Sequence, residues 1–278
     1  MIDVSRLWVT EWIVLGFFAY LILLARVFPL SSRQRLRVLA VGLVCAGLAV
    51  MLSQLRLSPI LRVARDWLPA MYLLQGYWLC GVFFRRPMLA VEQRLIDSDR
   101  ALFRVTNLTA FLTRGPKLLL EYLELMYLLV YPLVPISFGL FIWLGFRASA
   151  DNFWAAILLA GYGCYGWLPW IQTRPPRSLE RENPLTGRNL FFRRLNILVL
   201  DRSSVQVNMF PSGHTSVAAA AALALTSASP RVGILMLIAA ASITTATVLG
   251  RYHYTLDSVL GVFVGGLGWW IGFHVIGM

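Results

Sequence analysis

The sequence contains few charged residues, and acidic residues are the scarcer kind. Only 14% of its 278 residues are charged, whereas 58% are hydrophobic, and 13 acidic residues stand against 25 basic ones, for a formal net charge of +12. Soluble domains carry about a quarter charged residues, so this composition excludes an ordinary soluble domain. Lys117 is the one lysine. The positive charge is therefore almost all arginine, which suits membrane orientation and contact with anionic headgroups.

Cysteine is also scarce. Cys45, Cys80 and Cys164 each fall inside an apolar run, at unrelated positions without metal-ligand spacing, which argues against a cysteine metal site. There is also no soluble basic face interleaved with aromatic residues, as single-stranded nucleic acid requires. We therefore expect no cysteine metal site and no nucleic-acid partner, and we expect no cofactor.

Long apolar runs are what the sequence does contain. Crossing about 30 Å of hydrocarbon takes roughly 20 residues, and such runs occur near 8–29, 37–54, 67–84, 117–146, 153–171, 213–229, 231–250 and 255–276. The predicted fold is an all-α polytopic transmembrane helical bundle of about eight spans, with two N-terminal helices (1–66) and a six-helix core (67–278). Pro132 and Pro135 are expected to kink the fourth run or split it in two.

Two connections between the runs are long. Residues 85–116 mix charges with apolar residues at roughly helical spacing, which predicts a helix lying along the membrane interface. Residues 172–210 are polar and proline-rich, so they belong outside the lipid. The second connection ends at Pro211, and Ser212 is a suitable cap for a helix beginning there. The free N–H groups of that first turn favour a phosphate or another anion.

Two of the three histidines lie at the mouths of apolar runs. His253 precedes Asp257 by four residues, so a helical turn would bring the carboxylate to one ring nitrogen and leave the other as a free nucleophile. His214, at the start of another helix, would face the same place and supply a proton. The alternatives are a structural pair that fixes a helix end and a histidine bonded to backbone.

The ends of these apolar runs also carry groups that can bind phosphate. Ser212 and the amides around Gly213 would hold phosphoryl oxygens, since Gly213 lets the backbone approach closely. Arg174, Arg177 and Arg251 would neutralise the charge, because guanidinium binds phosphate in a bidentate manner. The alternative is that these arginines only orient the span ends or reach the interface.

Three segments, TRPPR, FPSGHTS and GRYHYTLDSVLG, resemble in order the signature of the type 2 phosphatidic acid phosphatase superfamily of integral membrane enzymes. The resemblance extends from about Tyr72 to the C-terminus. It implies that His253 attacks phosphorus and forms a phosphohistidine, that Asp257 orients it and that His214 protonates the leaving group. Ser212, Gly213 and arginine would bind the phosphate, without a metal.

The resemblance has departures. Trp167 stands where the family has a lysine, and Ala246-Thr247 stands where it has Ser-Arg, so two phosphate ligands are absent from their usual places and Arg251 is expected to replace one. The RPPR and RYHY segments resemble the branch of inositol phosphorylceramide synthase-like proteins. The main expectation is hydrolysis of a lipid phosphate monoester or diphosphate. The alternatives are transfer of a phosphoalcohol headgroup to a lipid hydroxyl and a lipid-phosphate-binding protein without turnover.

Two further expectations concern acidic residues and orientation. Glu121 and Glu124 lie on one face of the fourth run and are expected to pair with Lys117, the alternatives being a headgroup or an arginine of the active-site loops. Most of the 25 basic residues fall on the side of the site, which the positive-inside rule assigns to the cytoplasm. The family resemblance implies a site that faces the periplasm, the outside or an organelle lumen. The preference for arginine over lysine suggests a bacterial genome, so our expectation is the extracytoplasmic face of a bacterial inner membrane. Oligomeric state stays open.

Overall fold

A computed structural model describes residues 3–179, 184–185 and 187–277 of the chain. These ranges are helical and contain no β-strand, apart from one isolated bridge between Thr173 and Asn208. Short 3-10 turns and a C-terminal π turn join helices whose bounds are α1 Val9–Val27, α2 Ser32–Gln54, α3 Pro59–Gly81, α4 Leu89–Val105, α5 Leu108–Arg114, α6 Lys117–Leu128, α7 Val130–Trp143, α8 Ala150–Tyr165, α9 Pro176–Leu179, α10 Phe191–Ser203, α11 Gly213–Ala228, α12 Pro230–Leu249 and α13 Thr255–Trp270.

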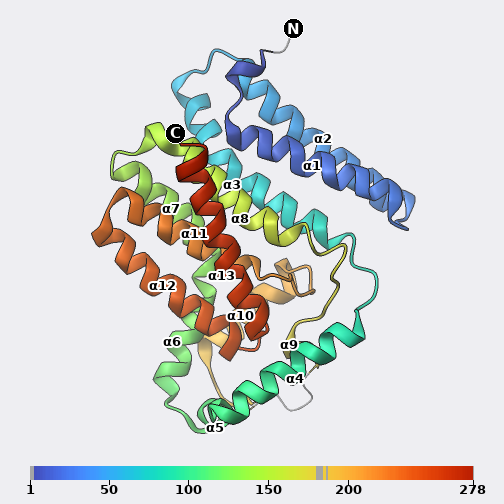
Figure 1. The fold of residues 1–278 in the computed structure, drawn as a ribbon, viewed down its shortest axis with the longest axis vertical. Coiled ribbons are helices and arrows are strands. Elements are labelled where there is room, and N and C mark those ends of the chain that lie inside the picture. Colours follow the sequence, from blue (N-terminus) through green and yellow to red (C-terminus); the bar gives the residue numbers. More distant parts are fainter. Residues whose placement is uncertain (1–2, 180–183, 186, 278) are drawn as a thin grey trace.

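The predicted all-helical membrane bundle is confirmed (Figure 1). Within the described ranges, 5 helical stretches are long and apolar enough to cross a bilayer, namely α1, α2, the α6–α7 pair, α12, and α13 with its π turn. The chain is therefore an integral membrane protein. Of the other expected spans, α8 and α11 have only 16 residues each and are largely buried by their neighbours.

The fourth apolar run is divided, as its prolines suggest. Helix α6 ends at Leu128 and α7 begins at Val130, with Pro135 inside α7. A proline has no N–H to donate and its ring crowds the preceding turn. The break falls beside the site described below, because Tyr127 before it and Tyr131 after it both pack against the ring of His214.

Helix α11 lies at the centre of the bundle, against α7, α8, α12 and α13. Its approach to α13 is close because Gly261 and Gly265 of α13 lie against the backbone of α11, where a Cβ would collide with Ser212 and Ser216. Small residues allow helices to approach in this way within a membrane. The result is that the N-termini of α11 and α13 meet.

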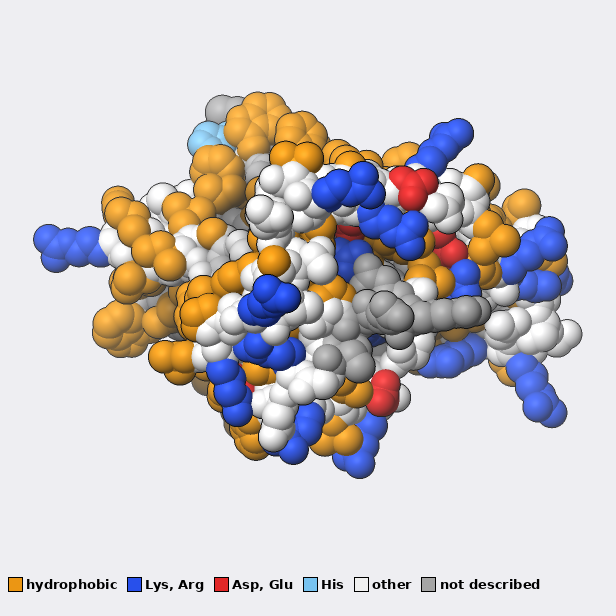
Figure 2. Space-filling view, turned by 90° about the horizontal axis from the view of Figure 1, so that it is seen from below, with side chains coloured by type: hydrophobic (Ala, Val, Ile, Leu, Met, Phe, Trp, Pro, Cys, Tyr) orange, Lys and Arg blue, Asp and Glu red, His pale blue; other side chains and the backbone are white. Residues whose placement is uncertain are grey.

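Helices α4 and α5 cross the lower end of the bundle in Figure 1. The interfacial helix expected in 85–116 is therefore present as a helix. Its buried face carries Glu92, Leu95, Asp99 and Phe103. Figure 2 views this end of the molecule and shows far more blue arginine and lysine side chains than red acidic ones.

Helix α1 packs on the core as well as on α2. Asp151, at the start of α8, accepts hydrogen bonds from the backbone N–H groups of Val9 and Thr10, both at 2.8 Å. The ring of Phe17 stacks on Tyr162 of α8 with centroids 3.8 Å apart. The first two helices thus join the bundle through α8.

Candidate active site

The two turns that precede α11 and α13 are held together at their backbones. The N–H of Ser212 donates to the main-chain carbonyl of Asp257 at 2.9 Å. The hydroxyl of Thr215 donates to the carbonyl of Ser258 at 3.0 Å. Ser212 caps α11, as expected, with its side chain accepting from the N–H of Thr215. These bonds fix the first turn of α11 against the first turn of α13.

The imidazoles of His253 and His214 face one another at this junction. Asp257 Oδ2 lies 3.1 Å from His253 Nδ1, the contact that the i, i+4 spacing predicted. His253 Nε2 lies 3.2 Å from His214 Nδ1. If Asp257 accepts a hydrogen bond from the N–H at Nδ1, then Nε2 of His253 carries the lone pair and the Nδ1–H of His214 donates to it. This assignment rests on the bonding network.

The protonation of His253 is set by its surroundings. Its side chain is buried, and burial together with the positive charge of Arg177 lowers its pKa well below the ordinary value of a histidine. Burial disfavours the imidazolium because the charged form loses its hydration. His253 is therefore neutral at pH 7, which is the form that can act as a nucleophile.

The three candidate arginines have different partners. Arg174 is bound to Glu92 of α4 through Nε at 3.1 Å and Nη2 at 2.8 Å, and that bond raises its pKa. Arg251 is bound to Asp99 of α4 at 2.7 Å, with both side chains buried. Arg177 has no carboxylate partner among the described residues. It is the arginine whose charge reaches His253.

Helix α4 also fixes the backbone of the site. Asp99 Oδ1 accepts from the N–H of Thr255 at 3.0 Å, at the start of α13, while its other oxygen holds Arg251. The main-chain N–H of Arg174 donates to Glu92 at 2.7 Å. We did not predict these two acids from the sequence. Their place on the apolar face of the expected interfacial helix could have revealed them, because carboxylates buried on such a face require partners.

Glu121 and Glu124 both face α10, and the expected pairing with Lys117 is wrong for the described residues. Glu121 accepts from the backbone N–H groups of Phe191 and Phe192, at 2.7 and 3.0 Å, and so caps α10. Glu124 is buried and forms an ion pair with Arg193 of α10 at 2.8 Å.

An apolar cavity of about 210 Å³ opens beside His214. Its lining comes from α3, α7, α8, α11 and the segment before α11, and includes Tyr77, Val134, Met209 and Val217. Tyr131, another lining residue, packs edge-on to the His214 ring at 5.9 Å between centroids. One side of the histidine pair is therefore a hydrophobic space between helices.

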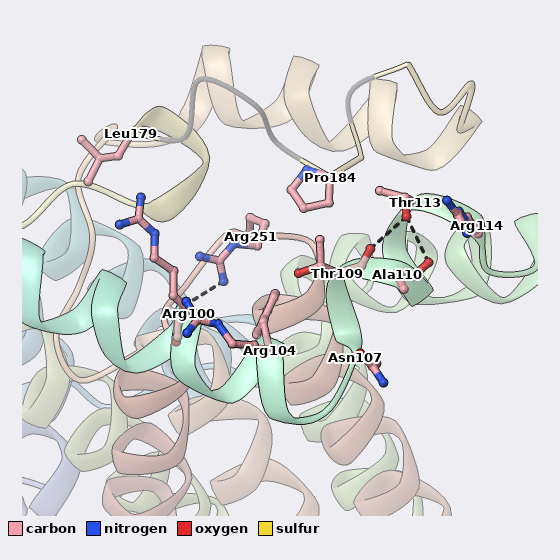
Figure 3. A pocket seen from close by; sticks show the side chains of 12 residues that line it. Arg100, Arg104, Asn107, Thr109, Ala110, Thr113, Arg114, Leu179, Pro184 and Arg251 are labelled. Carbon is pink, nitrogen blue, oxygen red and sulfur yellow. Dashed lines mark hydrogen bonds and ion pairs between the residues drawn. The ribbon is translucent and has the colours of Figure 1, made fainter.

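A second cavity, of about 980 Å³, is lined by α4, α5, Leu179, Pro184 and Arg251, and its arginines outnumber its acids. Figure 3 shows Arg100 and Arg104 of α4 near Arg251, with Arg114 at the far side. Arg251 therefore separates this cavity from the backbone that carries His253. Within the described ranges, no group of three or more His, Cys, Asp or Glu side chains has a metal-binding arrangement.

Comparison with known proteins gives one match. The family model of the PAP2 superfamily matches residues 93–271, which include most of α4, both His214 and His253, and Asp257. No curated protein and no solved structure matches the chain. The match is to the superfamily and does not distinguish its branches.

Proposed function

The chain belongs to the PAP2 superfamily, and we propose that it is an integral membrane lipid phosphatase that hydrolyses a lipid phosphate monoester or diphosphate through a phosphohistidine. The observation that carries this proposal is the chain of contacts from Asp257 through His253 to His214. The reaction needs a neutral nucleophile, a group that orients it and a proton donor on its far side. These three groups supply those roles.

The proposed reaction has two steps. In the first, the Nε2 lone pair of His253 forms a bond to phosphorus, the bond from phosphorus to the lipid oxygen breaks, and His214 gives that oxygen a proton that it has taken up with the anionic substrate. In the second, water attacks the phosphohistidine, His214 accepts a proton from the water, and the N–P bond breaks to release phosphate. Asp257 stabilises the charge on His253 in both steps.

The phosphoryl oxygens would lie at the N-terminus of α11. Ser212 and the N–H groups following Gly213 provide donors there, and the helix dipole favours an anion. Arg177, which has no carboxylate partner in the part of the chain that the structure describes, adds positive charge there. We assign Arg174 and Arg251 a supporting role, because each is bound to a carboxylate of α4.

The apolar cavity beside His214 supports a lipid leaving group. It meets the histidine proposed to protonate the leaving oxygen, and its walls are side chains from α3, α7 and α11. An acyl or prenyl chain entering between these helices would remain in a hydrophobic environment. The phosphate would stay at the polar end of the helices.

The proposal is tested by phosphate release from dioleoyl phosphatidic acid and farnesyl diphosphate by the purified protein in detergent, with EDTA present. His253→Ala is expected to abolish release, while His274→Ala, a histidine that packs on Trp269 in the C-terminal turn, leaves it unchanged. Brief reaction with ³²P-labelled substrate should trap an acid-labile label on the wild type. Equal activity of wild type and His253→Ala would refute the mechanism.

A second candidate is phosphotransfer to a lipid hydroxyl, favoured by the RPPR and RYHY segments of the sequence. The first step is the same, and a lipid alcohol replaces water in the second. Absence of phosphate release, together with product formation from paired phospholipid donor and ceramide-like acceptor, would establish transfer. Binding of the same lipids without either product would leave the non-catalytic lipid-phosphate-binding alternative.

We place the site on the extracytoplasmic face of a bacterial inner membrane, against the distribution of basic residues. Several arginines on this side are bound to acids, among them Arg174, Arg193 and Arg251, so their charge serves the site and does not report orientation. Labelling of a cysteine introduced at the exposed residue Arg194 by an impermeant maleimide on intact cells tests this placement. Labelling only after the cells are opened would contradict it.

A further inference from the structure

Glu124 of α6 is the centre of a buried polar cluster. Its Oε1 accepts from Arg193 Nη1 at 2.8 Å, and its Oε2 accepts from Asn196 Nδ2 at 2.8 Å and from the hydroxyl of Tyr252. The main-chain carbonyl of Glu124 also accepts from Asn196 Nδ2, at 2.8 Å. A buried carboxylate with this many donors holds its partners firmly.

Two of these partners reach the loop of residues 250–254, which joins α12 to α13 and contains His253; we call it the catalytic loop. Tyr252 is a member of the loop. Arg193 Nη1 also donates to the carbonyl of Gly250 at 3.2 Å. The other side of the loop is held by Asp99 through Arg251. The loop therefore lies between two carboxylates on different helices.

Tyr252 contacts the groups around both histidines. Its ring stacks on Tyr127 of α6, with centroids 3.7 Å apart and an interplanar angle of 10°. Tyr127 in turn packs against the ring of His214 at 5.6 Å. The guanidinium of Arg177 lies 5.9 Å from the centre of the Tyr252 ring. His253 follows directly in the chain, so a shift of Tyr252 moves every one of these neighbours.

We propose that Glu124 is a positioning residue, which fixes the hydroxyl of Tyr252 and thereby the alignment of His253 with His214 and Arg177. The inference rests on the proposed function, since alignment matters only if these groups react. Burial and the nearby Glu124 raise the pKa of Tyr252 well above its ordinary value. The phenol therefore keeps its proton and donates a hydrogen bond to the carboxylate.

The substitution Glu124→Gln tests the proposal at nearly constant shape. An amide places an NH₂ group where one carboxylate oxygen accepted a bond, so a donor then faces either Arg193 or Tyr252. Misplacement of catalytic groups by about 1 Å costs on the order of 100-fold in rate. We expect kcat on dioleoyl phosphatidic acid or farnesyl diphosphate to fall about 100-fold, with KM within about threefold of wild type.

Glu121→Gln is the matched control. Glu121 lies one turn away on α6 and also binds α10, but its partners are the N–H groups of Phe191 and Phe192 and not the catalytic loop. We expect its kcat to stay within about threefold of wild type. Tyr252→Phe, which removes only the hydroxyl, should lower kcat about tenfold, and adding it to Glu124→Gln should cause little further loss, because both act through one bond.

Hydrogen–deuterium exchange of the same proteins measures the loop without any substrate. In Glu124→Gln the amides of the catalytic loop should exchange at least about tenfold faster than in wild type, whereas Glu121→Gln should affect only the start of α10. Unchanged loop exchange in Glu124→Gln, or an equal loss of kcat in both glutamine variants, would overturn the proposal. If the wild type releases phosphate from neither dioleoyl phosphatidic acid nor farnesyl diphosphate, the proposed function is contradicted. The exchange experiment would still show whether Glu124 holds the catalytic loop in place.

Discussion

The buried ion pair between Asp99 and Arg251 gives a stability prediction that can be worked out from the structure. Both side chains are 2% exposed, and Asp99 Oδ2 lies 2.7 Å from Arg251 Nη1. The other carboxylate oxygen caps α13 through the N–H of Thr255. Asp99→Asn would keep the size of the side chain but place an uncharged group against a buried guanidinium.

We expect Asp99→Asn to lower the free energy of unfolding by several kcal/mol. Removing one partner of a buried ion pair destabilises a protein by about 3–5 kcal/mol. In Asp99→Asn the guanidinium loses the carboxylate charge, and if the amide oxygen still caps α13, an NH₂ donor faces Arg251 in its place. For a chain of this size, 1 kcal/mol corresponds to about 2–4 °C in melting temperature. We therefore expect Asp99→Asn to lower the melting temperature in detergent by about 6–20 °C. Phosphate release should also fall, because Arg251 and Thr255 flank His253.

Asp97→Asn is the control on the same helix. Asp97 pairs with Arg100 at 3.7 Å, but the two side chains are 59% and 66% exposed, and such exposed pairs contribute about 0–1 kcal/mol. Its melting temperature should lie within about 4 °C of wild type. Equal melting temperatures for the two asparagine variants, measured by intrinsic fluorescence during heating, would refute the assignment of Asp99 as a buried anchor of the loop.

Three other predictions concern single side chains. Arg177→Gln should raise KM and lower kcat/KM for phosphate release by about 100-fold. Arg174→Gln should lower kcat/KM less, because Arg174 is bound to Glu92. Equal losses of kcat/KM in the two variants would contradict this prediction. The pKa of His253 is lower in the folded protein than in the unfolded chain. As pH falls from 7 to 5, the unfolded chain therefore binds a proton that the folded protein does not, and the free energy of unfolding decreases. His253→Gln should reduce that loss by about 2 kcal/mol at pH 5, and parallel pH profiles of melting temperature would refute it. Gly265→Ala should cost about 1–3 kcal/mol by overpacking against α11, whereas Gly266→Ala, whose Cβ meets nothing within 4 Å, should not destabilise the protein in the same melting assay.

Part of the site was predictable because it depends on short spacings. The distance of four residues from His253 to Asp257 fixes their contact once α13 begins at Thr255. Ser212 caps α11 for a similarly local reason. The long apolar runs likewise predicted helices at nearly the observed places. Local spacing determines these features, since each contact joins a residue just before a helix to a residue in the first turn of that helix.

The number of membrane spans was less predictable. Hydropathy measures how apolar a segment is, and it does not tell whether lipid or protein surrounds that segment. Helices α8 and α11 are apolar but short, and other helices bury most of their surfaces. Helix α3 is long enough, yet carries charged residues near its start, among them Arg65 and Asp66.

The sequence by itself determined the helices, the motif order and the pairing of His253 with Asp257. Only the tertiary structure decided which charges reach the histidines. Asp99 and Arg251 are 152 residues apart, and Glu124 and Tyr252 are 128 apart. Such pairs depend on how α4 and α6 cross the ends of α12 and α13, which no local periodicity encodes. The same packing binds Arg174 and Arg251 to acids and leaves Arg177 facing His253, because an arginine's role is set by the carboxylates that the fold brings to it.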